Sequence, residues 1–171
     1  KSYGIEVPFL RKDKSDDFST VTEATLEAID QAEDYYDEKY DIIVQLMANA
    51  PLRNDVDICD HLENFINSNN LFQISSFRFG WMNPWWAFKM KNASEHEWML
   101  KEGIGKRSQD LDQLYCPSGA IWIANVSALK MSGTFYGPAY CFHEINWKHA
   151  VDIDDYEDLE FAKALHETLH K

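Results

Sequence analysis

The chain has 171 residues, and its 16 Lys and Arg against 29 Asp and Glu give a net charge of −13 with His neutral. Apolar residues make up 45%, which is enough to bury the core of one domain over residues 1–171 and excludes a wholly disordered chain. The charge argues against general nucleic-acid binding, which needs clustered Lys and Arg, and no apolar run approaches the roughly 20 residues of a membrane span.

The first half of the chain predicts two helices around one strand. A capping box opens the first helix, and a β-branched apolar run has the composition of a buried parallel strand. We expect a polar loop at residues 11–19, then a helix that begins at Thr20 and has a solvated acidic end at 33–41. The strand follows at 41–47, and the second helix begins at Asn54 or Asp55 and stops at 68–70.

The second half predicts further strands and helices around an aromatic segment that holds four of the six Trp. We expect a strand at 72–79, followed by the Trp-rich segment at 81–100. Further strands are expected at 119–124 and 151–153, and helices at 126–131 and 156–169. Strands that alternate with helices favour a parallel α/β sheet. Residues 72–118 break the alternation and are interpreted as an inserted β excursion.

Three cysteines without a CxxC pair predict neither a disulfide framework nor a zinc site, and the six His show no metal-ligand spacing along the chain. The cysteine usage favours a reducing compartment, so we expect a cytoplasmic protein.

Asp152 and Asp154 are the strongest candidate for chemistry. On a strand, residues two apart point the same way, and this strand would end just before a helix, where α/β sheets bind ligands. Paired carboxylates repel each other unless a cation lies between them, and hard oxygen ligands suit Mg²⁺. The alternative is that Asp154 or Asp155 only caps the last helix.

Three further segments offer weaker candidates. Asn49 and Arg53 follow a predicted strand and offer amide and guanidinium groups for an anionic ligand, although an ordinary strand-to-helix turn looks much the same. Gly119 permits close backbone approach or serves as a turn glycine. Phe135 and Tyr136, between two glycines, either line a sugar or acyl pocket or belong to the core.

Four blocks, taken together and in this order, resemble the acylneuraminate cytidylyltransferases (CMP-sialic acid synthetases). They are residues 6–11 (EVPFLR), 46–53 (LMANAPLR), 117–121 (PSGAI) and 151–154 (VDID). The resemblance implies an α/β fold: a Rossmann-like nucleotidyltransferase sheet with helices on both faces and a β excursion for dimerisation. It implies a Mg²⁺-dependent reaction in which a 2-keto sugar acid attacks the α-phosphate of CTP and pyrophosphate leaves, and a homodimer.

The same resemblance implies roles for individual residues. Asp152 and Asp154 match the metal-binding, catalytic aspartates of the family. The positions that match its substrate-binding motifs are Asn49, Arg53, Gln109, Ser118, Gly119, Phe135 and Tyr136. Departures from the family pattern fall at Met47, Cys116, Ser118 and Trp86, and they leave the identity of the sugar acid open.

The family begins with a strand and a glycine-rich basic loop that cradles the triphosphate, whereas this sequence starts at Lys1. We therefore expect an N-terminally incomplete domain that binds CTP poorly by itself. The alternative hypothesis is a non-catalytic remnant whose Trp-rich segment serves dimerisation or partner binding. A weaker third reading is a hydrolase that uses Asp152 and Asp154.

Overall fold

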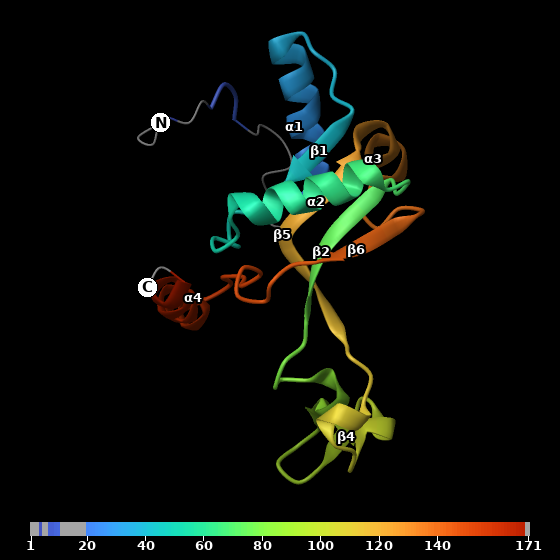
Figure 1. Ribbon diagram of the computed structural model, residues 1–171, viewed down its shortest axis with the longest axis vertical. Coiled ribbons are helices and arrows are strands. Elements are labelled where there is room, and N and C mark those ends of the chain that lie inside the picture. Colours follow the sequence, from blue (N-terminus) through green and yellow to red (C-terminus); the bar gives the residue numbers. More distant parts are fainter. Residues whose placement is uncertain (1–3, 5–6, 11–19, 170–171) are drawn as a thin grey trace.

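The computed structural model describes Gly4, residues 7–10 and residues 20–169. The loop expected at 11–19 lies outside the described residues, and so do both ends of the 6–11 block. A four-stranded sheet forms the centre of the molecule, in the order β1-β5-β2-β6 (Figure 1). Its strands are β1 (Ile42–Gln45), β2 (Phe72–Arg78), β5 (Tyr115–Asn125) and β6 (Tyr140–Glu144).

The sheet is mixed, so the expectation of a parallel sheet was wrong. β5 pairs antiparallel with both β1 and β2, whereas β2 and β6 are parallel. The chain leaves β2, forms the excursion and returns directly into β5, so the two strands pair as the arms of one long hairpin. Consequently β1, β2 and β6 run in one direction and β5 in the other, so the carboxyl ends of β2 and β6 lie beside the amino end of β5. β1 ends further along β5, where Gln45 pairs with Trp122.

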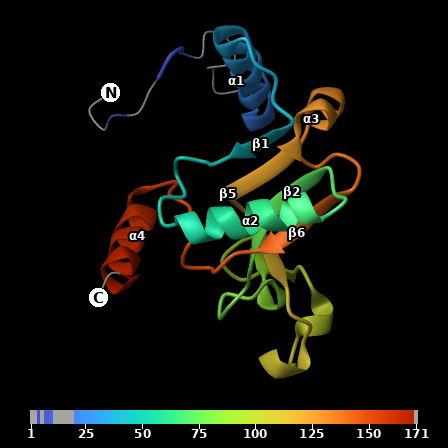
Figure 2. The ribbon, with the colours of Figure 1, turned by 45° about the horizontal axis from the view of Figure 1, so that its top comes forward.

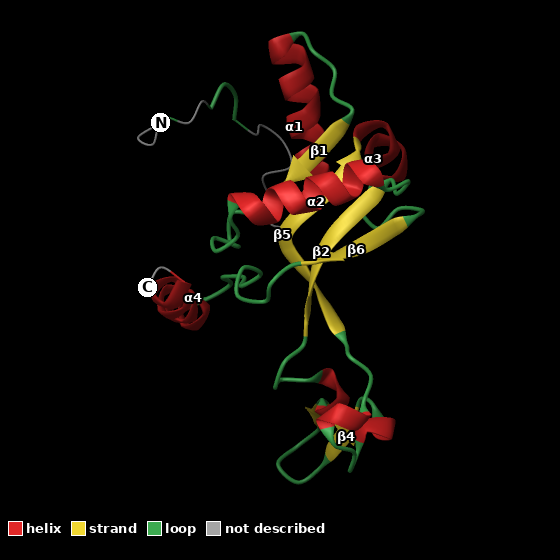
Figure 3. Cartoon of the chain, in the orientation of Figure 1, coloured by secondary structure: helices red, strands yellow, loops and turns green. Residues whose placement is uncertain are grey.

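Helices cover both faces of the sheet, as the α/β assignment requires (Figures 2 and 3). α1 (Val21–Tyr36) and α3 (Val126–Ser132) pack on one face, in a core that includes Ile29, Phe72 and Leu129. α2 (Asp55–Asn67) covers the other face, where Phe65 meets Ile121 and Ile123. The alternation of β5 side chains between these cores fixes its register.

Local signals determine where the helices begin and end. The predicted capping box of Thr20 and Glu23 is present, and Asn54 forms a second box with Asp57 at the start of α2. Gly133 ends α3 in the left-handed conformation, at φ 64°. α4 (Tyr156–Leu169) occupies the range expected for the last helix.

Two strand assignments differ from the sequence-based expectation. Residues 151–153 form a loop, not a strand, because the amide of Ile153 bonds the Asn49 carbonyl, 2.9 Å away, instead of joining a ladder. The edge strand β6 at 140–144 was missed. No helix among the described residues is long and apolar enough to cross a membrane.

The excursion projects away from the sheet (Figure 1) and spans residues 79–114, because 72–78 and 115–118 belong to β2 and β5. It holds a two-stranded hairpin of β3 (Phe88–Met90) and β4 (His96–Trp98), with three short 3₁₀ turns. Large apolar side chains on it are exposed to solvent: Trp81 by 86%, Met82 by 68% and Met90 by 61%. This segment therefore presents apolar surface outside the main core.

Candidate active site

Three of the four sequence blocks meet at the sheet edge where β1 ends and β5 begins. The loop after β1 (residues 46–53) contacts the start of β5 through Met47 and Gly119, and contacts the 151–154 loop through the Asn49–Ile153 bond. The hydroxyl of Ser118 donates to the Ala150 carbonyl, 3.4 Å away. Blocks that lie far apart in the sequence are thus in contact with one another.

Gly119 leaves room for the side chain of Met47. A β-carbon placed on Gly119 would lie 2.5 Å from the Met47 sulfur. A glycine here lets the loop after β1 lie directly on β5. The sequence motif is therefore explained by packing between two site segments.

A buried hydrogen-bond network fixes the start of β5. The Ser118 carbonyl accepts from the Ser75 hydroxyl at 2.9 Å and from the Trp122 indole at 2.7 Å. Ser75 in turn accepts from the amide of Ile121 at 3.0 Å. Because these groups are buried, losing one of them leaves an unsatisfied polar atom, which makes the local geometry rigid.

Asp152 and Asp154 lie in the loop before α4, and both are exposed. The helix-capping role falls to Asp155, whose carboxylate accepts from the amides of Glu157 and Asp158 at 2.8 and 3.0 Å. Within the described part of the chain, the Asp152 and Asp154 carboxylates take part in no hydrogen bond or ion pair. These two side chains therefore remain available for a ligand.

The negative charges of this loop lie close enough together to affect one another. Partial burial, followed by the charges of Asp154 and Asp158, raises the pKa of Asp152 above the usual range of an aspartate. Carboxylates that disfavour one another's charge in this way are stabilised by a divalent cation between them. Their hard oxygen ligands fit Mg²⁺.

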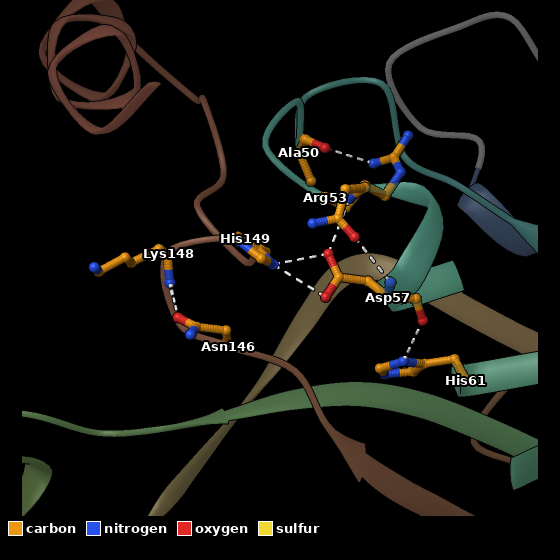
Figure 4. Close-up of polar contacts among 8 residues, drawn as sticks. Ala50, Arg53, Asp57, His61, Asn146, Lys148 and His149 are labelled. Atoms are coloured by element: carbon orange, nitrogen blue, oxygen red, sulfur yellow. Dashed lines mark hydrogen bonds and ion pairs between the residues drawn. The ribbon is translucent and has the colours of Figure 1, made fainter. Parts of the chain in front are cut away.

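The loop is held against α2 by hydrogen bonds between His149 and Asp57, which were not predicted from the sequence. Both carboxylate oxygens of Asp57 lie 2.8–3.0 Å from Nδ1 of His149, and Asp57 also accepts from the amide of Asn54 (Figure 4). His149 directly precedes Ala150, which bonds Ser118. The contact could not be predicted from the sequence, because Asp57 and His149 are 92 positions apart.

Arg53 has an internal partner in this structure. One of its guanidinium nitrogens donates to the Met47 carbonyl at 2.5 Å and to the Ala50 carbonyl at 2.6 Å, and Figure 4 shows the bond to Ala50. The side chain thereby closes the turn after β1 and holds Met47 over Gly119. Its position in the motif is thus explained by loop geometry, and any direct role in substrate binding is a proposal.

The aromatic pair is divided by burial. Phe135 is fully buried in the core, with its ring 5.2 Å from that of Trp122. Tyr136 is 45% exposed and continues an aromatic row with Tyr140 and Phe142. Only Tyr136 of the pair is therefore exposed to solvent, whereas Phe135 belongs to the core beneath Trp122, which both rings contact.

Gln109 is not brought to the loops around Asp152. It lies in a 3₁₀ turn of the excursion (Ser108–Asp110), where its side chain accepts from the Ser108 hydroxyl at 3.5 Å. Of the departures from the family pattern, Met47 and Ser118 lie inside the site, Cys116 lies on β5 beside it, and Trp86 lies in the excursion. The site changes thus concentrate where β1 and β5 meet.

Known proteins share both the sequence and the fold. The chain is 30% identical to the pseudaminic acid cytidylyltransferases of Campylobacter jejuni subsp. jejuni serotypes O:23/36 and O:2, over 171 residues that cover 99% of this chain and 72% of each relative. No protein-family model matches it. The structure of CMP:2-keto-3-deoxy-manno-octonic acid synthetase complexed with CTP matches with a TM-score of 0.57 and 13% identity, over 90% of this chain and 70% of that one, which supports the fold. Together with the convergence of the sequence blocks at one edge of the sheet, this likeness shows that the chain belongs to the sugar-acid cytidylyltransferase family that includes the pseudaminic acid cytidylyltransferases.

Proposed function

We propose that this protein is a cytidylyltransferase that activates a sialic-acid-like 2-keto sugar acid with CTP. A hydroxyl oxygen of the sugar acid forms a bond to the α-phosphorus of CTP, the bond to the β-phosphate breaks, and pyrophosphate leaves. The observation that carries the proposal is the convergence of the Met47, Gly119 and Asp152 segments at one edge of the sheet. A 30% likeness to pseudaminic acid cytidylyltransferases along nearly the whole chain supports it.

We assign Mg²⁺ to the carboxylates of Asp152 and Asp154, and this metal binding is the catalytic role proposed for the two residues. The structure leaves both side chains without internal partners among the described residues, and the raised pKa of Asp152 reflects the repulsion that a bound cation relieves. When bound there, Mg²⁺ would neutralise phosphate charge during the transfer. The clamp between Asp57 and His149 would hold the loop in place for this purpose.

For substrate binding we propose the Asn49 amide group, the backbone around Gly119, and the outer ring of Tyr136. Tyr136 packs edge-on against Trp122 at 5.8 Å, and together they offer an apolar surface to an acyl group on the sugar. The substrate-binding groups are held in place by three residues that support them: Phe135, Arg53 and Ser118. Gln109, on the projecting excursion, is available to the partner subunit of a dimer.

The protein is proposed to act as a homodimer in the cytoplasm, with the excursion as its dimer interface. The exposed Trp81, Met82 and Met90 supply the apolar surface that such an interface needs. The same surface supports the second candidate function, a dimerisation or partner-binding module without catalysis. The two candidates differ in whether CTP is bound and turned over.

The test is an assay of the full-length protein with CTP, Mg²⁺ and a panel of 2-keto sugar acids: pseudaminic acid, N-acetylneuraminic acid and 2-keto-3-deoxy-manno-octonic acid. We expect a CMP-linked product and pyrophosphate in equal amounts with one of them, and none when EDTA removes the metal. A dimer that forms no product from any of these acids and releases no heat when titrated with CTP would favour the non-catalytic module.

A further inference from the structure

A cluster of metal-ligating side chains lies away from the proposed active site, between α2 and β6. Asp60 and His61 come from α2, and His143 comes from β6. One ligand atom of each lies within 4.8 Å of the other two. The cluster could not be predicted from the sequence, because 83 positions separate Asp60 from His143 and the spacing matches no metal motif.

His61 is the buried member, and one of its ring nitrogens lacks a well-formed hydrogen bond to the described residues. Only 1% of the residue is exposed. Its Nδ1 lies 2.9 Å from the Asp57 carbonyl and donates to it, so Nε2 carries the lone pair (Figure 4). Nε2 is buried and makes no hydrogen bond of ordinary distance and angle to a described residue, although the backbone of His143 lies close to the ring. Such an orphaned acceptor is costly unless something outside the chain binds it.

The orientation of His61 is that of a metal ligand. A ligating imidazole usually donates its second ring N–H to a backbone carbonyl or a carboxylate, which fixes the tautomer and turns the other nitrogen to the metal. The bond from His61 to the Asp57 carbonyl performs this task. Asp57 is itself held by its ion pair to His149, so this outer support is rigid.

The two partners of His61 are close enough to complete the set. The ring of His143 lies edge-on to that of His61, with centroids 4.6 Å apart, and its Nε2 is 2.7 Å from Oδ2 of Asp60. Tetrahedral zinc, with bonds of about 2.0 Å, needs ligand atoms about 3.3 Å apart. The Asp60 side chain is 64% exposed, which leaves it free to rotate by the small amount required.

We propose that Asp60, His61 and His143 bind a divalent transition-metal ion, with Zn²⁺ as the natural occupant. Two imidazole nitrogens and one carboxylate form the three-ligand set that keeps a fourth position open for water. Imidazole ligands also separate this site from the all-oxygen pair of Asp152 and Asp154, which suits Mg²⁺. The metal would tie α2 to the edge strand β6.

Solvent reaches the site from the side of Asp60. A shallow depression of about 360 Å³ adjoins it, lined by Asp55, Val56, Cys59, Asp60 and Glu63. Its carboxylates raise the local concentration of cations. The thiol of Cys59 is exposed there and is a competing ligand that the test must separate.

The test is titration of the metal-free protein with Zn²⁺ by calorimetry and with Co²⁺ by absorption spectroscopy. We expect one ion per chain, a tetrahedral Co²⁺ spectrum without a sulfur-to-metal charge-transfer band, and a higher thermal unfolding midpoint with Zn²⁺. His143→Gln and Asp60→Asn, at partly exposed positions that should fold, are each expected to weaken binding at least about tenfold. The proposal is independent of catalysis, so Asp154→Asn should bind Zn²⁺ like the wild type.

His96→Gln is the matched control, because it removes an exposed imidazole from β4 in the excursion. It should leave Zn²⁺ affinity unchanged. The proposal is overturned if no ion binds, if His143→Gln binds as tightly as His96→Gln, or if a charge-transfer band shows that Cys59 holds the metal.

Discussion

Asp57 and His149 join the beginning of α2 to the loop that carries the candidate catalytic aspartates, with 2.8 Å between Oδ2 and Nδ1. Asp57 at the same time closes the capping box with Asn54. One carboxylate therefore positions the start of α2 and the loop of the candidate aspartates together. The contact is largely buried, with 13% of the Asp57 side chain and 18% of the His149 side chain exposed.

Replacing His149 by Ala should lower the free energy of unfolding by about 1–3 kcal/mol, because Asp57 then loses a partner in a mostly buried position. Urea unfolding measures the loss. Lys148→Ala is the control, since the contact of Lys148 with Asn146 uses its backbone amide and survives the change. Equal stabilities of the two variants would contradict the clamp.

Asp152→Asn should have opposite effects on stability and on metal binding. Burial and the neighbouring charges of Asp154 and Asp158 raise the pKa of Asp152, so its ionised form destabilises the folded protein. We expect the variant to unfold at a higher temperature than the metal-free wild type at pH 8. The difference should vanish at acid pH, where Asp152 of the wild type is protonated.

Differential scanning calorimetry at several pH values, without and with Mg²⁺, checks this prediction. Mg²⁺ should stabilise the wild type more than the variant, because only the wild type keeps both carboxylates. A variant that is less stable than the wild type at every pH would mean that Asp152 has a structural role instead.

Gly119→Ala should destabilise the protein by about 1 kcal/mol, the low end of the cost of overpacking, because the new methyl would displace the flexible Met47 side chain. Adding Met47→Ala should recover part of the loss, so the double-mutant cycle should show coupling between the two sites. Gly80→Ala is the control, since nothing lies within 4 Å of its added carbon. Strictly additive effects at positions 47 and 119 would argue against the contact.

Glu33 joins α1 to α3 and should make stability depend on acid pH. Its side chain is 6% exposed and accepts from Lys39 at 2.7 Å and from Lys130 at 3.0 Å, which lowers the pKa of the carboxyl. A lowered pKa contributes stability that is complete above the ordinary glutamate pKa of about 4.3 and is lost as pH falls through the native value.

Glu33→Gln should therefore be less stable than the wild type at pH 7, and the gap should narrow below pH 4, because the wild type then loses the same charge. Chemical denaturation at both pH values measures the two gaps. Glu63→Gln, an exposed position on α2, serves as control. A gap of the same size at both pH values would show that the lysines contribute nothing through charge.

Removing apolar surface from the excursion should weaken dimerisation. Trp81→Ser combined with Met82→Ser is expected to shift the protein from dimer towards monomer in size-exclusion chromatography with light scattering. Tyr156→Ser removes an equally exposed aromatic ring, 86% accessible, from α4 and should leave the dimer intact. A dimer that tolerates the double substitution would locate the interface elsewhere.

Local signals explain what could be predicted from the sequence. The capping box of Thr20 and Glu23 was predicted, and Asn54 was one of two candidates for the start of α2, because such signals lie within a few positions of each other. β6 also had a signal, because residues 140–144 are bounded by turn residues, Gly137-Pro138 before them and Asn146 after them. The run is short and aromatic, so the signal was weak. The direction of β5 had no local signal, because it is set by the whole excursion between β2 and β5.

The candidate site shows the same division. Asp152 and Asp154 were singled out from their spacing on a predicted strand, whereas the structure places them in a loop that bonds Asn49. The pairing of Asp57 with His149, and of Asp60 with His143, joins residues 92 and 83 positions apart. Such contacts follow from the packing of α2 on the sheet, and no pattern within a single segment predicts them.

The central claim is that Asp154 belongs to a metal-dependent transfer site while its neighbour Asp155 only caps α4. The most direct measurement compares Mg²⁺-dependent pyrophosphate release from CTP and the sugar acid by Asp154→Asn and by Asp155→Ser in the full-length protein. We predict that Asp154→Asn loses about 100-fold or more of the rate, whereas Asp155→Ser, which retains a capping hydroxyl, stays close to the wild type. Wild-type turnover by Asp154→Asn would contradict the account.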